Sequence, residues 1–143
     1  MKKYFIRWSG LFMFTFFFSI CGNAQWVRTN LKYAGSVNDL TILGETLFAA
    51  TDGGVYRSTD SGMNWVSVNN GLIYNEYQGI PDTAVLCFAV DKNTLFVGTW
   101  GDGVYHSTNL GNNWISSGID SGTNNYNIFN IAVNNKYLCY SAI

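Results

Sequence analysis

Ser58–Trp65, with the sequence STDSGMNW, decides the fold because it returns 49 residues later as STNLGNNW at Ser107–Trp114. The two copies share Ser at the first place, Asp or Asn at the third, Gly at the fifth and Trp at the eighth. We call these positions the repeat motif. A pattern that recurs at a period of roughly 20–50 residues indicates a repeat architecture, in which each repeat is one supersecondary unit.

The sequence before each repeat motif is repeated as well. Thr46–Thr51 (TLFAAT) returns as Thr94–Thr99 (TLFVGT), 48 residues on. Gly53–Tyr56 (GGVY) returns as Asp102–Tyr105 (DGVY), 49 residues on. The one-residue difference between the two spacings falls in a Gly-containing segment, which predicts a loop there.

A third copy begins near the C-terminal end of the sequence. Ala132–Val133 match Ala89–Val90, and Leu138 matches Leu95, both at a spacing of 43 residues. This copy stops at Ile143, before its Gly-Val-Tyr segment and its repeat motif. We therefore expect an incomplete array whose partners include the remaining repeats of a longer chain. Repeats bury their faces only against neighbours, so the segment 25–143 alone should associate or be poorly soluble.

Each repeat contains four short runs rich in β-branched and aromatic residues, separated by Asn, Asp and Gly. Such runs are typical of strands and turns. In the second repeat they are Val85–Val90, Thr94–Thr99, Gly103–Ser107 and Asn113–Ser117. Four strands in every 43–49 residues indicate an all-β fold of β-propeller blades. Each blade is expected to be a four-stranded antiparallel sheet, and the chain to hold about two and a half of them.

The repeats also set the expected domain boundaries. Gln25–Arg28 (QWVR) resembles Asn64–Ser67 (NWVS), so the segment after the leader starts with an outer strand. The expected organisation is a signal peptide at 1–24 and a partial propeller at 25–143. The latter divides into an outer strand at 25–30, blades at 37–70 and 85–118, and the start of the next blade at 128–143.

Ser58-x-Asp60-x-Gly62-x-x-Trp65 resembles the Asp-box, or BNR repeat, of β-propellers. That family includes sialidases, sortilin-type receptors, photosystem II assembly factors and family-74 xyloglucanases, and the resemblance covers Gln25 to the end of the chain. It implies that the motif lies on the hairpin between the third and fourth strands of a blade, away from the active-site face. The second copy departs from the family pattern because Asn109 replaces Asp.

The residue types of the repeat motif suit a tight turn. Its Gly permits a positive φ, its Asp or Asn can accept hydrogen bonds from turn N–H groups, and its Trp can fill the space between strands. A structural role is the favoured interpretation, and a metal or sugar site built on Asp60 is the alternative. The expected structural positions are Ser58, Asp60, Gly62, Trp65, Ser107, Asn109, Gly111 and Trp114.

The N-terminus is typical of a secretory signal peptide. Three basic residues within the first seven precede the apolar run Leu11–Ile20, and Gly22–Ala24 offers a small-x-small cleavage site before Gln25. We therefore expect secretion to the extracellular space, cell surface or periplasm. A membrane anchor is the alternative, but the run is about half of the roughly 20 residues that a spanning helix needs. A lipoprotein signal at Cys21 is less favoured, because such signals have a small residue before the Cys and Ile20 stands there.

Composition excludes several classes of protein. With 48% hydrophobic and 12% charged residues in 143, the chain is too apolar to be disordered. Without the leader, five basic residues face nine acidic ones, a net charge of −4, which argues against nucleic-acid or membrane binding. Export would permit a disulfide between Cys87 and Cys139. Both lie in apolar runs, which favours buried free thiols.

The ligand face, if the chain has one, is expected on the loops between the second and third strands and between successive blades. Aromatic and carboxylate side chains gather there and would suit a glycan or protein ligand. The alternative is that these loops are polar merely because they face water. The candidate residues are Asp52, Tyr74, Glu76, Tyr77, Trp100, Asp102, Asp120 and Tyr126.

Signals of catalysis are weak. Sialidases use an arginine triad, but only Arg28 and Arg57 lie outside the leader, and both are expected on strands. No spacing selects a pair of glycosidase carboxylates, and His106 is expected to be an exposed strand residue. We predict no metal or cofactor. The favoured function is a secreted, non-catalytic propeller for binding or scaffolding. The alternative is the N-terminal fragment of a secreted Asp-box glycoside hydrolase, sialidase-like or xyloglucanase-like, with catalytic residues outside this chain.

Overall fold

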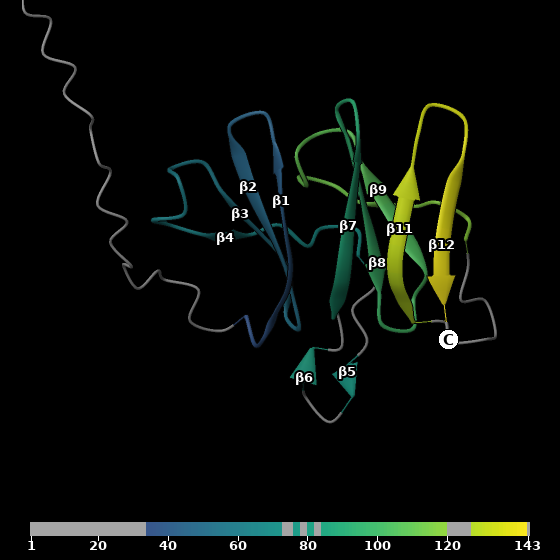
Figure 1. Ribbon diagram of the computed structural model, residues 1–143. Helices are drawn as coiled ribbons and strands as arrows, with labels where there is room; N and C mark the ends of the chain where they lie inside the picture. The colour runs from purple at the N-terminus through teal and green to yellow at the C-terminus, as the bar shows by residue number, and fades with distance from the viewer. Residues whose placement is uncertain (1–33, 73–75, 78–79, 82–83, 120–126, 143) are drawn as a thin grey trace, which may run out of the picture.

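The computed structural model describes residues 34–72, 76–77, 80–81, 84–119 and 127–142, and every regular element among them is a β-strand (Figure 1). The all-β prediction is therefore confirmed for this part of the chain. The leader at 1–24 and the outer strand at 25–30 lie outside the described residues.

The described strands form two four-stranded antiparallel sheets and two two-stranded ones, of which the shorter is the hairpin described below. The first sheet has the order β1 (Val37–Leu43), β2 (Thr46–Thr51), β3 (Gly54–Ser58), β4 (Val66–Ser67). The second repeats it with β7 (Val85–Asp91), β8 (Thr94–Thr99), β9 (Val104–Ser107) and β10 (Ile115–Ser116). The third pairs β11 (Ile128–Val133) with β12 (Leu138–Ala142). These sheets span residues 37–67, 85–116 and 128–142.

One segment differs from the expectation. The connection at 71–83 was expected to be a loop, but it contains a short antiparallel hairpin of β5 (Glu76–Tyr77) and β6 (Ile80–Pro81). The alternation of polar and apolar residues in this segment is too short to distinguish a hairpin from a loop.

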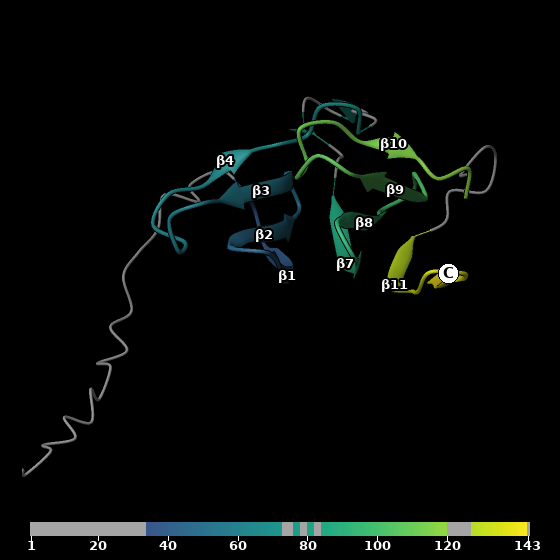
Figure 2. The same cartoon turned by 90° about the horizontal axis from the view of Figure 1, so that it is seen from above.

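The three sheets lie side by side as a fan (Figure 2). The first strands of the sheets, β1, β7 and β11, are neighbours along one side, and the last strands, β4 and β10, lie on the other side. Within the described residues the fan is open and no sheet closes on itself.

The same irregularity marks the first strand of all three sheets. The register with the second strand shifts between Val37 and Asp39 in β1, and between Val85 and Cys87 in β7. It shifts at the corresponding place in β11, between Ile128 and Asn130. A β-bulge re-aims the side chains that follow it. Asp39, Cys87 and Asn130, which follow the bulge in the three strands, therefore hold equivalent positions in the repeat.

The core lies between the sheets. Phe48 of the first sheet meets Phe88 of the second edge to face, with ring centroids 6.4 Å apart. Val97 in β8 is fully buried in the same cluster, and a second cluster joins Cys87 and Ile131 between the second and third sheets. The strands β2 and β8 are buried along most of their length, because side chains of both faces are covered.

Two sets of hydrogen bonds connect the first sheet to the second. On the inner side, the Asp39 carboxylate Oδ2 accepts from the Phe88 N–H at 2.7 Å. On the outer side, the Trp114 indole N–H donates to the Val68 carbonyl at 2.7 Å, and the Trp114 backbone N–H donates to the Asn70 carbonyl at 2.8 Å. These bonds satisfy backbone groups that no strand within the sheet could reach.

The two motif tryptophans differ in burial. Trp114 is only 2% exposed because it packs against the first sheet, whereas Trp65 is half-buried, since no described sheet lies on its outer side. The expectation that both fill a space between strands is therefore met fully by Trp114 alone. Each indole N–H has an acceptor, which for Trp65 is the Gly62 carbonyl of its own turn.

Trp114→Ala should lower the free energy of unfolding by about 3–5 kcal/mol, because it removes a large buried side chain. Trp65→Ala should cost less, below about 3 kcal/mol. Chemical denaturation followed by circular dichroism measures both. As a control, Trp114→Phe keeps one aromatic ring in place but leaves a smaller cavity and the Val68 carbonyl unpaired, so a loss of about 1–3 kcal/mol is expected. Equal losses for Trp65→Ala and Trp114→Ala would contradict this account.

Candidate functional site

The strand order separates the connections into two ends. In each sheet the turn after the first strand and the turn after the third strand lie at one end, because successive strands are antiparallel. The loop between the second and third strands lies at the opposite end, with the connection to the next sheet (Figure 1). The repeat motifs lie after the third strands, at the first of these ends, which we call the motif end. Asp52, Trp100 and Asp102 lie at the opposite end, which we call the loop end.

The first repeat motif forms a turn closed by its own side chains. Ser58 Oγ accepts from the Gly62 N–H at 2.9 Å and donates to Asp60 Oδ1 at 2.8 Å. The Asn64 N–H donates to Asp60 Oδ1 at 2.8 Å, and the Asn64 amide donates to Oδ2 at 2.7 Å. Gly62 has a φ of 87°, the left-handed conformation that the sequence predicted.

The second repeat motif makes the same turn without a charge. Ser107 Oγ accepts from the Gly111 N–H at 3.0 Å, and the Asn113 N–H donates to Asn109 Oδ1 at 3.0 Å. Gly111 has a φ of 79°. Since Asn109 performs the role of Asp60, the turn needs a hydrogen-bond acceptor and not a carboxylate. Both oxygens of Asp60 are occupied within the turn, which supports the structural interpretation over a metal or sugar site.

Asp60→Asn should leave thermal stability near neutral pH unchanged, whereas Asp60→Ala should lower the melting temperature because the turn N–H groups lose their acceptor. The Asn64 N–H and amide, together with Ser58, hold the pKa of Asp60 below its usual value. A lowered folded-state pKa contributes stability above the unfolded pKa of about 4, and that contribution is lost as the pH falls through the folded pKa.

The Asn variant should therefore lose less stability than the parent between pH 7 and pH 2. Thermal melts at both pH values test this. A parent and an Asp60→Asn variant with the same acid sensitivity would show that this carboxylate does not couple protonation to the turn.

At the loop end, Asp52 is bound to its own sheet. Its Oδ2 accepts from the Ser36 N–H at 2.9 Å, and its Oδ1 accepts from the Asn38 amide at 3.1 Å. The Ser36 N–H is the main reason that the pKa of Asp52 lies below its usual value. Asp52 therefore stays ionised at neutral pH and fixes the start of β1.

Trp100 and Phe129 form an exposed aromatic pair at the loop end. Trp100 follows β8 and Phe129 lies at the bulge of β11, so the pair joins the second and third sheets. Their ring centroids are 6.3 Å apart with an interplanar angle of 80°, and the residues are 46% and 45% exposed. Sequence patterns predicted Trp100 for this site but not Phe129.

The structure describes only some of the other predicted loop residues. Asp102 is half-buried in the turn between β8 and β9, where its N–H donates to Thr99 Oγ1 at 3.1 Å. Glu76 and Tyr77 form β5, at the loop end. Tyr74, Asp120 and Tyr126 lie outside the described residues. The structure therefore brings Trp100 together with Phe129, whereas the described carboxylates Asp52 and Asp102 lie on the loops of two different sheets.

His106 and Arg57 both make contacts with other residues of the fold. His106 is half-buried, not exposed as expected, because its ring packs beside Phe96 with centroids 6.0 Å apart and its Nδ1 lies 3.1 Å from Ser117 Oγ. Arg57 lies on β3, as expected. Its guanidinium donates to the Leu110 carbonyl at 2.8 Å, which ties the second motif turn to the first sheet.

The two described cysteines differ from each other. Cys87 is buried and its thiol lies 3.4 Å from the Ile128 carbonyl, whereas Cys139 is exposed on β12. The expectation that both thiols are free agrees with the structure, but the expectation that both are buried is wrong for Cys139. The apolar run around Cys139 is misleading because no described sheet covers that face of β12.

Alkylation should distinguish the two thiols. Burial raises the pKa of Cys87 to about 11, and the thiolate is the reactive species. At pH 8, iodoacetamide should therefore modify Cys139 at least tenfold faster than Cys87 in the folded protein, as measured by peptide mass spectrometry. Denaturant should equalise the two rates. Similar rates without denaturant would contradict the burial of Cys87.

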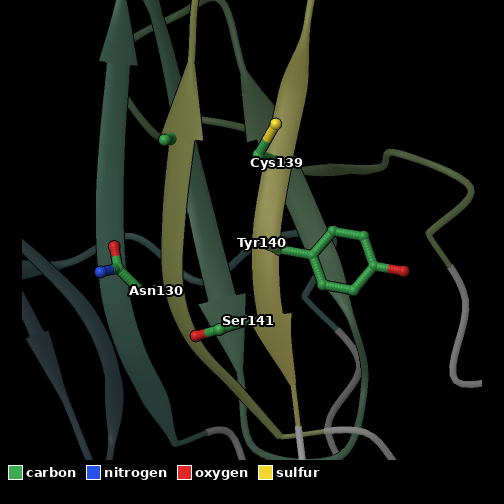
Figure 3. A pocket seen from close by; sticks show the side chains of 5 residues that line it. Asn130, Cys139, Tyr140 and Ser141 are labelled. Carbon is green, nitrogen blue, oxygen red and sulfur yellow. The ribbon is translucent and has the colours of Figure 1, made fainter.

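The cavities that the described residues line include two that are open to the surface. One of about 200 Å³ lies on the β11–β12 hairpin and is lined by Asn130, Ala132, Cys139, Tyr140 and Ser141 (Figure 3). One of about 390 Å³ lies at the motif end and is lined by Leu43, Gly44, Glu45, Thr46, Asn93, Thr108 and Leu110. Among the residues that the structure describes, no three His, Cys, Asp or Glu side chains are grouped so that they could hold a metal ion.

Comparison with known proteins does not assign this chain to a family. Neither a protein-family model nor a curated protein matches its sequence. No helix in the described part of the chain is long and apolar enough to cross a membrane. The function therefore has to be inferred from the residues themselves.

Proposed function

We propose that the chain is a secreted, non-catalytic β-propeller module of the Asp-box type that binds a ligand at the loop end. The four-stranded antiparallel meanders, their fan arrangement and the bulge repeated in three sheets support this architecture. The two motif turns, with the same hydrogen bonds 49 residues apart, support the Asp-box assignment. The N-terminal leader supports secretion.

The exposed pair of Trp100 and Phe129 is the observation that carries the binding function. Large exposed aromatic side chains that contact each other mark interaction sites more often than scattered apolar residues do. The rings come from two adjacent sheets, so packing between the sheets fixes their separation before a ligand arrives. An aromatic face accepts the apolar face of a sugar ring or an apolar peptide side chain. A glycan or a protein is therefore the expected ligand.

The described acidic and basic groups favour binding over hydrolysis. A glycosidase needs a general acid whose pKa is raised and a second carboxylate beside the scissile bond. The hydrogen bonds of Asp52 lower its pKa instead. Asp60 is used in a turn at the opposite end, and the Arg57 guanidinium is used between two sheets. These groups thus serve the fold, and we propose a binding or scaffold role.

Trp100→Ala should abolish, or weaken at least tenfold, binding to the ligands that the parent protein retains on glycan and peptide arrays. The loss follows from removal of the larger ring of the pair. Phe129→Ala should weaken the same ligands, because the two rings lie together. Surface plasmon resonance on array hits gives the dissociation constants.

Met63→Ala is the matched control, since Met63 is 70% exposed at the motif end and lies far from the loop end along the strands. It should leave binding unchanged. Equal binding by the parent and Trp100→Ala would remove the aromatic pair from the site, and equal loss in the Met63 variant would show that the effect is not local.

A further inference from the structure

Two faces of the fan are uncovered within the described part of the chain. The first, which we call the head face, lies on β1 and carries Val37, Leu40 and Ile42. These residues are 51%, 60% and 63% exposed. Three large apolar side chains on one exposed strand form a patch that favours association.

The second uncovered face, which we call the tail face, is at the other end of the fan on β11 and β12. It carries Asn130, Ala132, Cys139 and Ser141, all of them exposed. These four residues and Tyr140 line the cavity of about 200 Å³ on this hairpin, and Figure 3 labels all of them except Ala132.

The repeat register shows what covers a head face when a neighbour is present. Val37 corresponds to Val85 and Ile128, and Leu40 corresponds to Phe88 and Ile131, at spacings of 48 and 43 residues. The four later residues are at most 8% exposed, because each packs against the preceding sheet. The head face is therefore the same surface without its partner.

The register also shows what covers a tail face. Cys139 corresponds to Phe48 in the first sheet and Phe96 in the second. Phe48 packs against Phe88 of the next sheet, and Phe96 packs into the cluster between the second and third sheets. The tail face is thus the surface that packs against the following sheet. The smaller Cys139 side chain leaves it hollow where the earlier sheets are filled.

One polar contact joins the first two sheets at this part of the register, where the second sheet has Cys87 in place of Asp39. Asp39 accepts the Phe88 N–H of the next sheet, and Asn130 holds the position of Asp39 after the bulge of its own strand. Within the described residues, no hydrogen bond is made by the Asn130 side chain. Leu40 holds the position of Phe88, and its N–H donates to the Asp39 carboxylate of its own strand at 2.8 Å.

We infer that the tail face of one molecule binds the head face of a second copy of this chain and thereby continues the sheet-on-sheet packing seen within the molecule. Leu40 and Ile42 of the second copy fill the hollow above Cys139 and Ala132. The N–H of the incoming Leu40 already has an acceptor in its own Asp39, so the contact between copies rests on apolar packing. The contact is heterologous, because different surfaces meet, and it can continue from copy to copy or close a ring. It uses neither Trp100 nor Phe129, so it does not rest on the proposed ligand site.

The test uses the full chain, exported from a bacterial host and purified, with its N-terminus determined by mass spectrometry. Sedimentation velocity over a hundredfold range of concentration measures self-association. Leu40→Glu blocks the head face and Ala132→Glu blocks the tail face, and both residues are exposed, so the fold should survive, as circular dichroism melts can show. The parent should associate, and each variant alone should associate at least tenfold more weakly.

The decisive sample is an equimolar mixture of the two variants. Leu40→Glu keeps an intact tail face and Ala132→Glu keeps an intact head face, so the mixture should form a one-to-one dimer that grows no further. Ile115→Glu, on the outer strand β10 and away from both faces, is the control and should associate like the parent.

Several results would overturn the inference. They are a monomeric parent, a blocked variant that associates as strongly as the parent, a mixture that does not form the dimer, and an Ile115→Glu control that is also monomeric. Head-to-head or tail-to-tail pairing would be recognised because one of the two blocked variants would then associate normally. None of these results bears on array binding by Trp100.

Discussion

The contact of Trp114 with the preceding sheet is the interaction on which the rest of the structure depends. The indole N–H and the backbone N–H of this residue both donate to the segment that follows β4, at the Val68 and Asn70 carbonyls. The side chain is buried to 2% exposure at the same place. Because Asp39 joins the inner strands of the same two sheets, the sheets are fixed at both sides. Each sheet is stabilised by the other, because one face of β2 or β8 would otherwise be exposed to water.

This packing also determines where the functional groups lie. The motif turns close one end of each of the first two sheets, and their Ser and Asp or Asn side chains are used in hydrogen bonds within the turn. At the opposite end Asp52 and Thr99 are also bonded within their own sheets, but the aromatic pair of Trp100 and Phe129 spans two sheets and is exposed. The separation of a structural end from a loop end thus follows from the antiparallel order of four strands. It is the physical reason that binding is proposed at the loop end.

The sequence predicted the strands well because each is a short β-branched or aromatic run that recurs at a fixed spacing. It predicted the motif turns for the same reason, since Gly and Asx residues have local conformational preferences. Contacts between sheets were not predictable in this way. The Asp39 bond to Phe88, the role of Arg57 and the exposure of Cys139 depend on which sheet lies opposite, and local sequence does not encode that. Phe129 was missed because the bulge that turns it toward Trp100 has no residue signature of its own.

Amide hydrogen exchange at Phe88 and Trp114, followed by NMR, tests most directly whether the sheets fold as one body. The acceptors of both N–H groups lie in the first sheet, so neither group would be protected if the second sheet folded independently. The account predicts that both amides exchange as slowly as Val97 in the centre of the second sheet, with opening free energies close to that of global unfolding. Rapid exchange at Phe88 and Trp114 while Val97 stays protected would contradict it, because the two sheets would then be separate units.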